Sequence, residues 1–194
     1  MNILNVGYDS TNYYLIEQNH TRLLVDVGFP GTLPKLLAIL KRKDVSLGDI
    51  DYLFNTHYHP DHAGLVQELK NKGVKHIVLQ QQLASVPNLK TQVKPDSGFV
   101  EIRLQDSITL TVEESRSWLA SIGMSGEMVF TPGHSDDSIA LVLDEGIAFT
   151  GDFPHPMMVD ESTAEIVQQG WDKLRSLNVS RIYPGHGPIA RSIL

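Results

Sequence analysis

The pattern of apolar and polar positions in the first half of the chain switches between the periods of strands and helices. Short runs rich in Val, Ile, Leu and Thr predict strands, whereas Leu33, Leu36 and Leu40 recur at helical spacing. The predicted strands cover residues 11–17, 21–27, 51–56 and 75–80, and the predicted helices cover 33–43 and 63–72. This β-α-β-α-β order favours an α/β arrangement in which helices cover a sheet.

The second half begins with a less regular segment. Pro87, Pro95 and several polar residues between 80 and 98 predict a short helix and an exposed loop. Further strands are predicted over residues 100–104, 108–112, 127–131, 138–143, 147–150 and 180–183, with a helix over 161–177. Because no repeat or low-complexity segment divides the chain, we expect a single domain over residues 1–194.

Composition narrows the classes of protein that fit this pattern. The chain has no cysteine, so a metal site must be built from imidazole and carboxylate groups. The formal net charge is −7 and the longest basic run is Lys41-Arg42-Lys43, which disfavours a nucleic-acid partner. The N-terminus lacks the features of an export signal, and no stretch approaches the roughly 18 apolar residues of a membrane span. We therefore expect a cytoplasmic protein with a small-molecule substrate and no membrane partner; a homodimer is one open option for its oligomeric state.

Residues that can bind metal are concentrated between a predicted strand and a predicted helix, in the order His-x-His-x-Asp-His. His57 and His59 lie two apart on an extended segment, so their side chains can point the same way and hold one divalent ion. Asp61 and His62 can then turn toward a second ion. The alternative is a set of surface histidines, but concentrating such groups costs stability unless something pairs them. The segment therefore predicts a metal site.

Three later residues complete the predicted ligand set. His134, Asp152 and His186 each follow a predicted strand, and each comes directly after a glycine. Glycine permits tight backbone turns, so three separate loops can bring these side chains to one edge of a sheet. The candidate metal ligands are therefore His57, His59, Asp61, His62, His134, Asp152 and His186.

The order of these motifs resembles the metallo-β-lactamase superfamily, and particularly its glyoxalase II-like branch. The matching segments are Asp26-Val27-Gly28, Thr56 to His62, Thr131 to His134, Gly151-Asp152 and Pro184 to Gly187. The resemblance covers nearly the whole chain and implies a four-layer αβ/βα sandwich of two sheets, with helices outside and the metals at one edge. Because the sequence ends at Leu194, soon after His186, we expect no helical C-terminal domain of the kind that binds glutathione in glyoxalase II.

The resemblance also implies roles for the candidate ligands. The two sets are His57, His59 and His134 for one ion, and Asp61, His62 and His186 for the other. Asp152 would bridge the two ions. Asp26 would orient a ligand imidazole by accepting its second N–H; the alternative is a turn residue beside Gly28. The implied cofactors are two divalent metal ions, zinc before iron or manganese.

The implied chemistry is hydrolysis by a hydroxide that bridges the two ions, with Asp61 or Asp152 relaying a proton to the leaving group. We expect a small ester, thioester or lactone as substrate. A mononuclear iron dioxygenase acting on persulfides and a phosphodiesterase of the same fold are alternatives. A binding module without turnover is disfavoured because the full ligand set is present.

Two residues are candidate substrate contacts. Tyr58 lies within the histidine segment, and His155 lies on the loop after Asp152. A pair of carboxylates, Asp136 and Asp137, follows His134 where relatives often carry Pro-Gly, which leaves the charge preference for substrate open.

Overall fold

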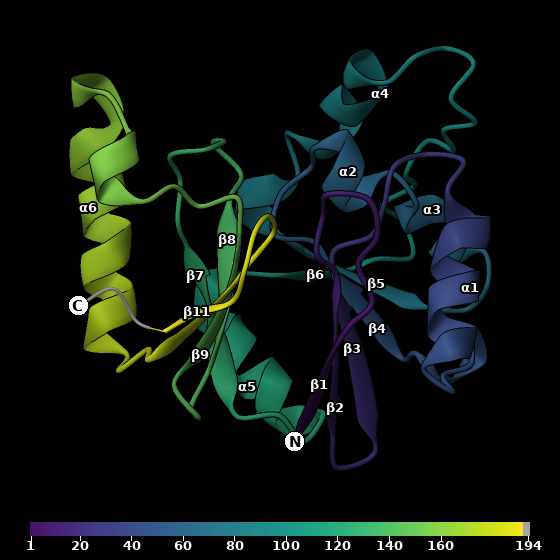
Figure 1. Cartoon of the computed structure of the whole chain (residues 1–194), viewed down its shortest axis with the longest axis horizontal. Coiled ribbons are helices and arrows are strands. Elements are labelled where there is room, and N and C mark those ends of the chain that lie inside the picture. Colours follow the sequence, from purple (N-terminus) through teal and green to yellow (C-terminus); the bar gives the residue numbers. More distant parts are fainter. Residues whose placement is uncertain (192–194) are drawn as a thin grey trace.

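The computed structural model describes residues 1–191 as two β-sheets with helices on their outer faces (Figure 1). The first sheet contains, in spatial order, β1 (Asn2–Asn5), β2 (Tyr14–Gln18), β3 (Thr21–Val25), β4 (Tyr52–Phe54), β5 (Lys75–Leu79) and β6 (Ile108–Leu110). The second contains β11 (Ala190–Arg191), β10 (Arg181–Pro184), β9 (Ile147–Gly151), β8 (Ile139–Leu143) and β7 (Gly126–Phe130).

The helices fall into groups by the sheet they cover. The first sheet is covered by α1 (Leu33–Arg42), α2 (Pro60–Ala63), α3 (Val66–Lys70) and α4 (Leu89–Gln92). On the second sheet lies α6 (Glu161–Ser176), and α5 (Val112–Ser121) contributes Leu119 to the core between the sheets. Short 3-10 turns occur at Leu47–Asp49, Gln80–Gln82, Val86–Asn88 and Pro156–Met158. None of the described helices is long and apolar enough to cross a membrane.

Side chains alternate between the two faces of each strand, and this alternation places apolar residues in separate core layers on the two sides of a sheet. Tyr14 and Ile16 of β2 pack in the core between the sheets with Leu141 of β8, whereas Leu15 packs on the opposite face with Leu36 of α1. Successive side chains of a strand point to opposite faces, so a strand that is apolar at every position is buried on both sides. A third core joins the second sheet to α6. The expected four-layer αβ/βα architecture is confirmed.

One predicted strand is wrong. Residues 101–104 form no regular structure, and β6 pairs directly with β5. The backbone here is bound by side chains of α3 instead, because Arg103 N–H donates to Gln67 Oε1 and Lys70 donates to the Arg103 carbonyl. Ile102 is buried in the helix-side core, so the alternation of apolar residues reflects an irregular segment packed on that core.

Other segments differ from the sequence-based prediction in kind or extent. The α5 helix was not predicted, although Thr111 and Glu114 form a capping box at its start. The β1 strand at the N-terminus was also missed. The helix predicted over 63–72 is divided into α2 and α3, and α2 begins earlier, at Pro60. This early start places Asp61 and His62 in a helical turn, directly after the extended His57 to His59 segment.

Strand direction determines where the candidate ligands meet. β3 and β4 are parallel, and β7, β9 and β10 share one direction because β8 is antiparallel to both β7 and β9, and β10 is parallel to β9. The loops that carry the ligands follow β4, β7, β9 and β10. At the edge where these loops lie, the two sheets are joined by backbone hydrogen bonds, including one from the Ile139 N–H of β8 to the carbonyl of Thr56, which follows β4.

Candidate metal centre

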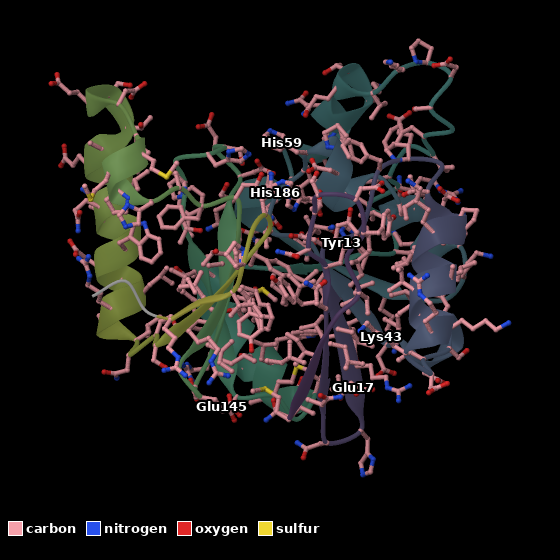
Figure 2. All side chains as sticks on the ribbon, viewed as in Figure 1. Tyr13, Glu17, Lys43, His59, Glu145 and His186 are labelled. Atoms are coloured by element: carbon pink, nitrogen blue, oxygen red, sulfur yellow. The ribbon has the colours of Figure 1, made fainter. Side chains whose placement is uncertain are left out.

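The seven candidate ligands lie together at this edge. Three groups of side chains each place their ligand atoms within 4.8 Å of one another: His57, His59 and His134; His57, His62 and Asp152; and Asp61, His62 and His186. Figure 2 shows His59, which follows a strand of the first sheet, near His186, which follows a strand of the second. The first and third groups coincide with the two ligand sets that the sequence implied.

The first set is made of imidazole nitrogens alone. His57 Nε2 lies 3.1 Å from His59 Nδ1, which lies 3.0 Å from His134 Nε2. The extended backbone at His59 places His57 and His59 on one side of the chain. Nitrogens this close and converging on one point suit a divalent ion with tetrahedral coordination.

The second set mixes imidazole with carboxylate. Asp61 Oδ2 lies 3.2 Å from His186 Nε2 and 3.5 Å from His62 Nε2. Asp152 reaches both sets: its Oδ1 lies 3.2 Å from His62 Nε2, and its Oδ2 lies 3.3 Å from His186 Nε2 and 3.5 Å from His134 Nε2. Asp152 therefore occupies the position that a bridging carboxylate requires.

The hydrogen bonds behind the cluster place a proton on Nδ1 of three imidazoles. His186 Nδ1 lies 2.7 Å from the Ser10 carbonyl oxygen, which can only accept, so Nδ1 carries the proton. His62 Nδ1 donates to Asp26 Oδ2 at 2.9 Å. His57 Nδ1 donates to the Thr56 hydroxyl, which itself donates to Asp26. His57 and His186 thus turn an unprotonated Nε2 toward the cluster, as metal ligation requires. His62 Nε2 faces the same point, between Asp61 and Asp152, where a metal ion would take the place of a proton.

Two buried atoms of the cluster also fit a bound ion. His62 Nε2 and Asp152 Oδ1 are buried 3.2 Å apart, and neither has a well-aligned hydrogen-bond partner among residues 1–191. A buried polar atom without a partner is costly, and a cation between the two would satisfy both. The donor set, with no thiolate, suits zinc, iron or manganese.

The surroundings of His62 favour a positive charge on its ring, whereas those of His57 oppose one. Burial opposes protonation of His62, but the Asp26 and Asp152 carboxylates outweigh burial and raise its pKa to about 10. Burial, reinforced by the neighbouring imidazoles, holds the pKa of His57 well below its usual value. His57 is thus neutral, as a ligand imidazole would be, while the carboxylates around His62 supply the field that a bound cation would need.

Asp26 lies behind the cluster, where a residue that orients a ligand imidazole would lie. Its side chain is buried, and its oxygens accept hydrogen bonds from the Thr56 N–H (2.7 Å), the Thr56 hydroxyl (2.8 Å) and His62. Burial raises the pKa of Asp26, against the lowering effect of His62 and of the Thr56 hydrogen bonds. Asp26 also follows β3 directly and has a positive φ of 62°, so its place in the turn after the strand and its contact with His62 occur together.

The side chain of Tyr58 does not reach the cluster. It is 1% exposed, and its hydroxyl lies 2.7 Å from Nε2 of the buried His76. On an extended segment the residue between His57 and His59 points to the opposite side, here the core. The side chain of Tyr58 therefore anchors the ligand segment from the side of the core, and a contact of this residue with substrate stays a prediction.

Sequence reasoning missed a buried scaffold around this segment. Asp137 is 4% exposed, and its Oδ2 accepts the Tyr58 N–H at 2.8 Å. The Gln82 amide donates to the carbonyls of Asn55 and Asp137. Asp136, by contrast, is exposed. The sequence flagged both carboxylates, but only through their effect on substrate charge.

The loop between β1 and β2 was missed as well. The Thr11 hydroxyl donates to Asp61 Oδ2 at 3.1 Å, and the Ser10 carbonyl holds His186. No pattern in the sequence marked these residues. The glycine before His186 has a steric reason, because a Cβ at Gly185 would collide with Asp152 Oδ1 and lie 2.6 Å from His62 Cε1.

A polar cavity of about 370 Å³ opens beside the first ligand set. His59 and His134 border it, and its remaining lining is Tyr58, Ser85, Asn88, Gln92, Ser135, Asp136 and Asp137. His155 does not border this cavity. Its ring lies 6.3 Å from that of Trp171 in α6, and its Nδ1 accepts the Met157 N–H at 3.2 Å.

Fold and site together define a metal-binding αβ/βα sandwich. Residues 6–186, which include every candidate ligand, match the family model of the metallo-beta-lactamase superfamily, and the chain belongs to this superfamily.

Curated relatives and solved structures agree with this assignment. A Beta-lactamase-like protein 2 homolog of Caenorhabditis elegans is 27% identical over 95% of this chain and 58% of its own length. A probable metallo-hydrolase of Methanocaldococcus jannaschii is 28% identical over 94% of this chain and 90% of its own length. The chain spans between 52% and 59% of the first three curated relatives that it matches.

Among solved structures, a metallo-beta-lactamase family protein from Thermus thermophilus superposes with a TM-score of 0.74 at 20% identity, covering 98% of this chain and 74% of that one. A class B3 di-zinc metallo-beta-lactamase from an Alaskan soil metagenome gives 0.73 at 17% identity, covering 95% and 75%. At these identities the likeness concerns the fold.

Proposed function

We propose that the chain is a hydrolase that uses two divalent metal ions, with zinc foremost, on a small ester, thioester or lactone. The observation that carries the proposal is the position of Asp152, whose two oxygens lie within 3.5 Å of ligand nitrogens from both sets. A carboxylate in this position serves to hold two ions close together. The relative described as a probable metallo-hydrolase supports the same reading.

Different residues of the chain would hold the metal ions and transfer protons. His57, His59 and His134 would hold one ion, and Asp61, His62 and His186 the other. When bound, such ions supply Lewis acidity and an activated water. Burial raises the pKa of Asp152, but the neighbouring imidazoles, His62 foremost, outweigh burial and hold this pKa below its usual value, so Asp152 is a carboxylate able to accept a proton. The Asp61 carboxylate, fixed by the Thr11 hydroxyl, is the second candidate for proton transfer to the leaving group.

The size and lining of the cavity support a small, polar substrate. Its volume of about 370 Å³ lies at the lower end of the range for small-molecule sites. If the substrate bond to be cleaved lies over His59 and His134, the polar groups of Asn88, Gln92 and Ser135 surround it and can form hydrogen bonds with the substrate. His155 remains a candidate only for a substrate that extends beyond this cavity.

The proposal is tested by elemental analysis of protein purified without added metal, together with a panel of thioesters, lactones, esters and phosphodiesters. We expect zinc or manganese, and turnover of a thioester, lactone or ester. A single iron with oxygen consumption on a persulfide would replace the proposal with the dioxygenase alternative. Turnover of phosphodiesters alone would replace the substrate class but keep the two-metal centre.

A further inference from the structure

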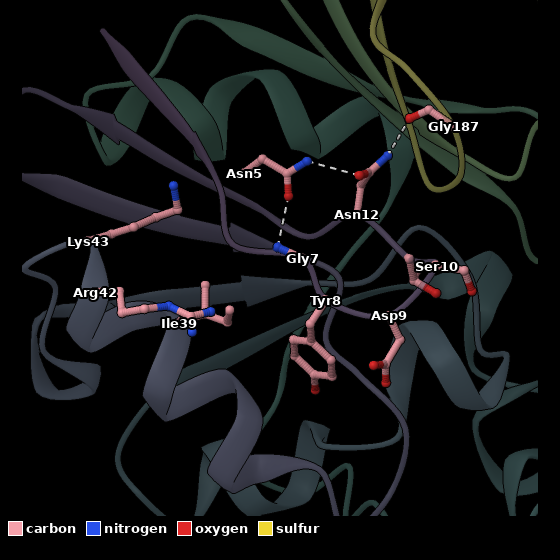
Figure 3. A pocket seen from close by; sticks show the side chains of 11 residues that line it. Asn5, Gly7, Tyr8, Asp9, Ser10, Asn12, Ile39, Arg42, Lys43 and Gly187 are labelled. Carbon is pink, nitrogen blue, oxygen red and sulfur yellow. Dashed lines mark hydrogen bonds between the residues drawn. The ribbon is translucent and has the colours of Figure 1, made fainter.

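A second cavity lies behind the loop that joins β1 to β2 (Figure 3). Its volume is about 560 Å³, and none of the seven candidate ligands lines it. One wall is the end of α1, with Ile39, Arg42 and Lys43; the other is the loop from Gly7 to Asn12. We refer to this cavity as the α1 groove.

The charge of the α1 groove is unusual for this chain. Arg42 and Lys43 belong to the longest basic run of a sequence whose net charge is −7. Asp9, the acidic residue of the lining, is paired with Lys35 at 2.8 Å. Neither Arg42 nor Lys43 forms an ion pair with a residue in the range 1–191. The groove therefore presents two cations that the described part of the chain leaves without a counter-charge.

The wall opposite these cations is held rigidly. Asn5 Oδ1 accepts the Gly7 N–H at 2.8 Å, Asn5 Nδ2 donates to Asn12 at 2.9 Å, and Asn12 Nδ2 donates to the Gly187 carbonyl at 2.9 Å (Figure 3). A Cβ at Gly7 would collide with the Thr11 carbonyl oxygen and lie 2.8 Å from the Asn12 Cα, so the loop is closely packed on itself. A rigid wall lowers the cost of ordering a bound ligand.

The same loop reaches the metal centre with its other face. Ser10 accepts from His186 at 2.7 Å and Thr11 donates to Asp61 at 3.1 Å, while both residues also line the α1 groove. One layer of loop residues thus separates the groove from the second ligand set. A ligand in the groove would contact the segment that positions His186 and Asp61.

We propose that the α1 groove is a binding site for an oxyanion, a carboxylate or phosphate-like group, held by Arg42 and Lys43. A guanidinium offers the planar pair of donors that matches such groups, and the Lys43 ammonium adds positive charge to the lining of the same groove. Complementing the helix dipole is the simpler role of a basic helix end, and it applies equally to Lys41. Lys41 does not line the groove, so it provides a control.

The test uses inorganic sulfate as probe and the metal-loaded protein, with backbone amide NMR shifts as readout. We expect saturable shifts at Gly7, Asn12 and Lys43. The double variant Arg42→Gln with Lys43→Gln should weaken sulfate binding at least about tenfold, because two charged contacts are lost. The variant Lys41→Gln with Lys72→Gln removes the same charge outside the groove and should bind within about twofold of the parent.

If both double variants weaken sulfate binding equally, the proposal is overturned, because a change in net charge alone would explain the loss of affinity. Shifts confined to the segment around His57, or no saturable shift at all, would also overturn it. None of these outcomes depends on the hydrolase proposal, since no turnover is measured.

A kinetic experiment distinguishes two sources of the oxyanion. Unlike the binding test, it rests on the proposed function. If the anion belongs to the substrate, the groove variant raises the KM of a carboxylated ester and leaves that of an uncharged ester unchanged. If it is a separate ligand, sulfate changes the turnover of the uncharged ester in the parent protein and not in the groove variant.

Discussion

Asp26 Oδ2 accepts a hydrogen bond of 2.9 Å from His62 Nδ1, and the same oxygen accepts the Thr56 hydroxyl that holds His57. His57 belongs to the first ligand set and His62 to the second. A single buried carboxylate therefore orients one ligand of each set. This arrangement makes Asp26 a positioning residue for the whole centre.

Replacing Asp26 should weaken both metal ions together. We expect Asp26→Ala to lower zinc affinity about 10- to 100-fold at each site, because both imidazoles lose the acceptor that fixes their orientation. Thr56→Val removes only the link to His57 and should affect mainly the first ion. Competition with a chromophoric chelator measures both affinities, and Asp172→Ala, on the exposed side of α6, is the control. An unchanged affinity in Asp26→Ala would contradict this role.

Asp137 and Asp136 should behave differently although they are adjacent. Asp137→Ala removes the acceptor of the Tyr58 N–H and should lower zinc affinity about tenfold by loosening the segment between His57 and His59. Asp137→Asn keeps an acceptor oxygen and should restore most of that affinity. Asp136→Ala, at an exposed position, should leave metal affinity unchanged. If Asp136→Ala and Asp137→Ala weaken zinc equally, a general charge effect explains both and the hydrogen bond does not.

The Tyr58 hydroxyl should matter for stability and not for catalysis. Tyr58→Phe leaves the buried His76 Nε2 without its partner, which should cost about 1–3 kcal/mol in the free energy of unfolding. Urea unfolding measures this cost. Because the ring lies in the core, turnover under native conditions should stay within about twofold of the parent. A large drop in kcat at unchanged stability would instead support Tyr58 as a substrate contact.

His76 should make the protein sensitive to acid. Burial, with a smaller effect of Lys70, lowers the pKa of His76 to about 3, so the folded state keeps it neutral while the unfolded chain binds a proton below about pH 6.5. The unfolded state thus holds more protons between these values, and stability falls as the pH falls. The slope attributable to His76 approaches about 1.4 kcal/mol per pH unit.

The variant His76→Gln isolates this contribution from those of the other histidines. Unfolding by urea from pH 7 to pH 4.5 should show a shallower loss of stability in the variant than in the parent, whatever the difference at pH 7. Parallel curves would mean that His76 is protonated in the folded protein.

The sequence predicted the part of the site that depends on ligand type and order along the chain. Histidine and aspartate after successive strands are visible as a pattern, because strand direction brings such positions to one edge. The roles of Ser10, Thr11 and Asp137 depend on loops that meet only in three dimensions, and no local spacing marks them. The direction of the Tyr58 side chain follows from the alternation along an extended segment, which turns it away from His57 and His59 and toward the core.

The same distinction holds for the fold. The strand predicted over 100–104 followed from alternating apolar residues, but Gln67 and Lys70 bind its backbone from α3. The α5 helix carries a weaker apolar stripe, and only its capping box at Thr111 and Glu114 marked it. Burial between layers was predictable from the apolar runs, whereas the partner of each backbone segment was not.

The central claim is that one chain holds two metal ions bridged by Asp152. The most direct measurement is the number of divalent ions per chain, by elemental analysis and native mass spectrometry, in the parent and in Asp152→Ala. We predict two ions in the parent, and loss of at least one together with loss of hydrolysis in the variant. One ion per chain in the parent, or two ions and full hydrolysis in Asp152→Ala, would contradict the account.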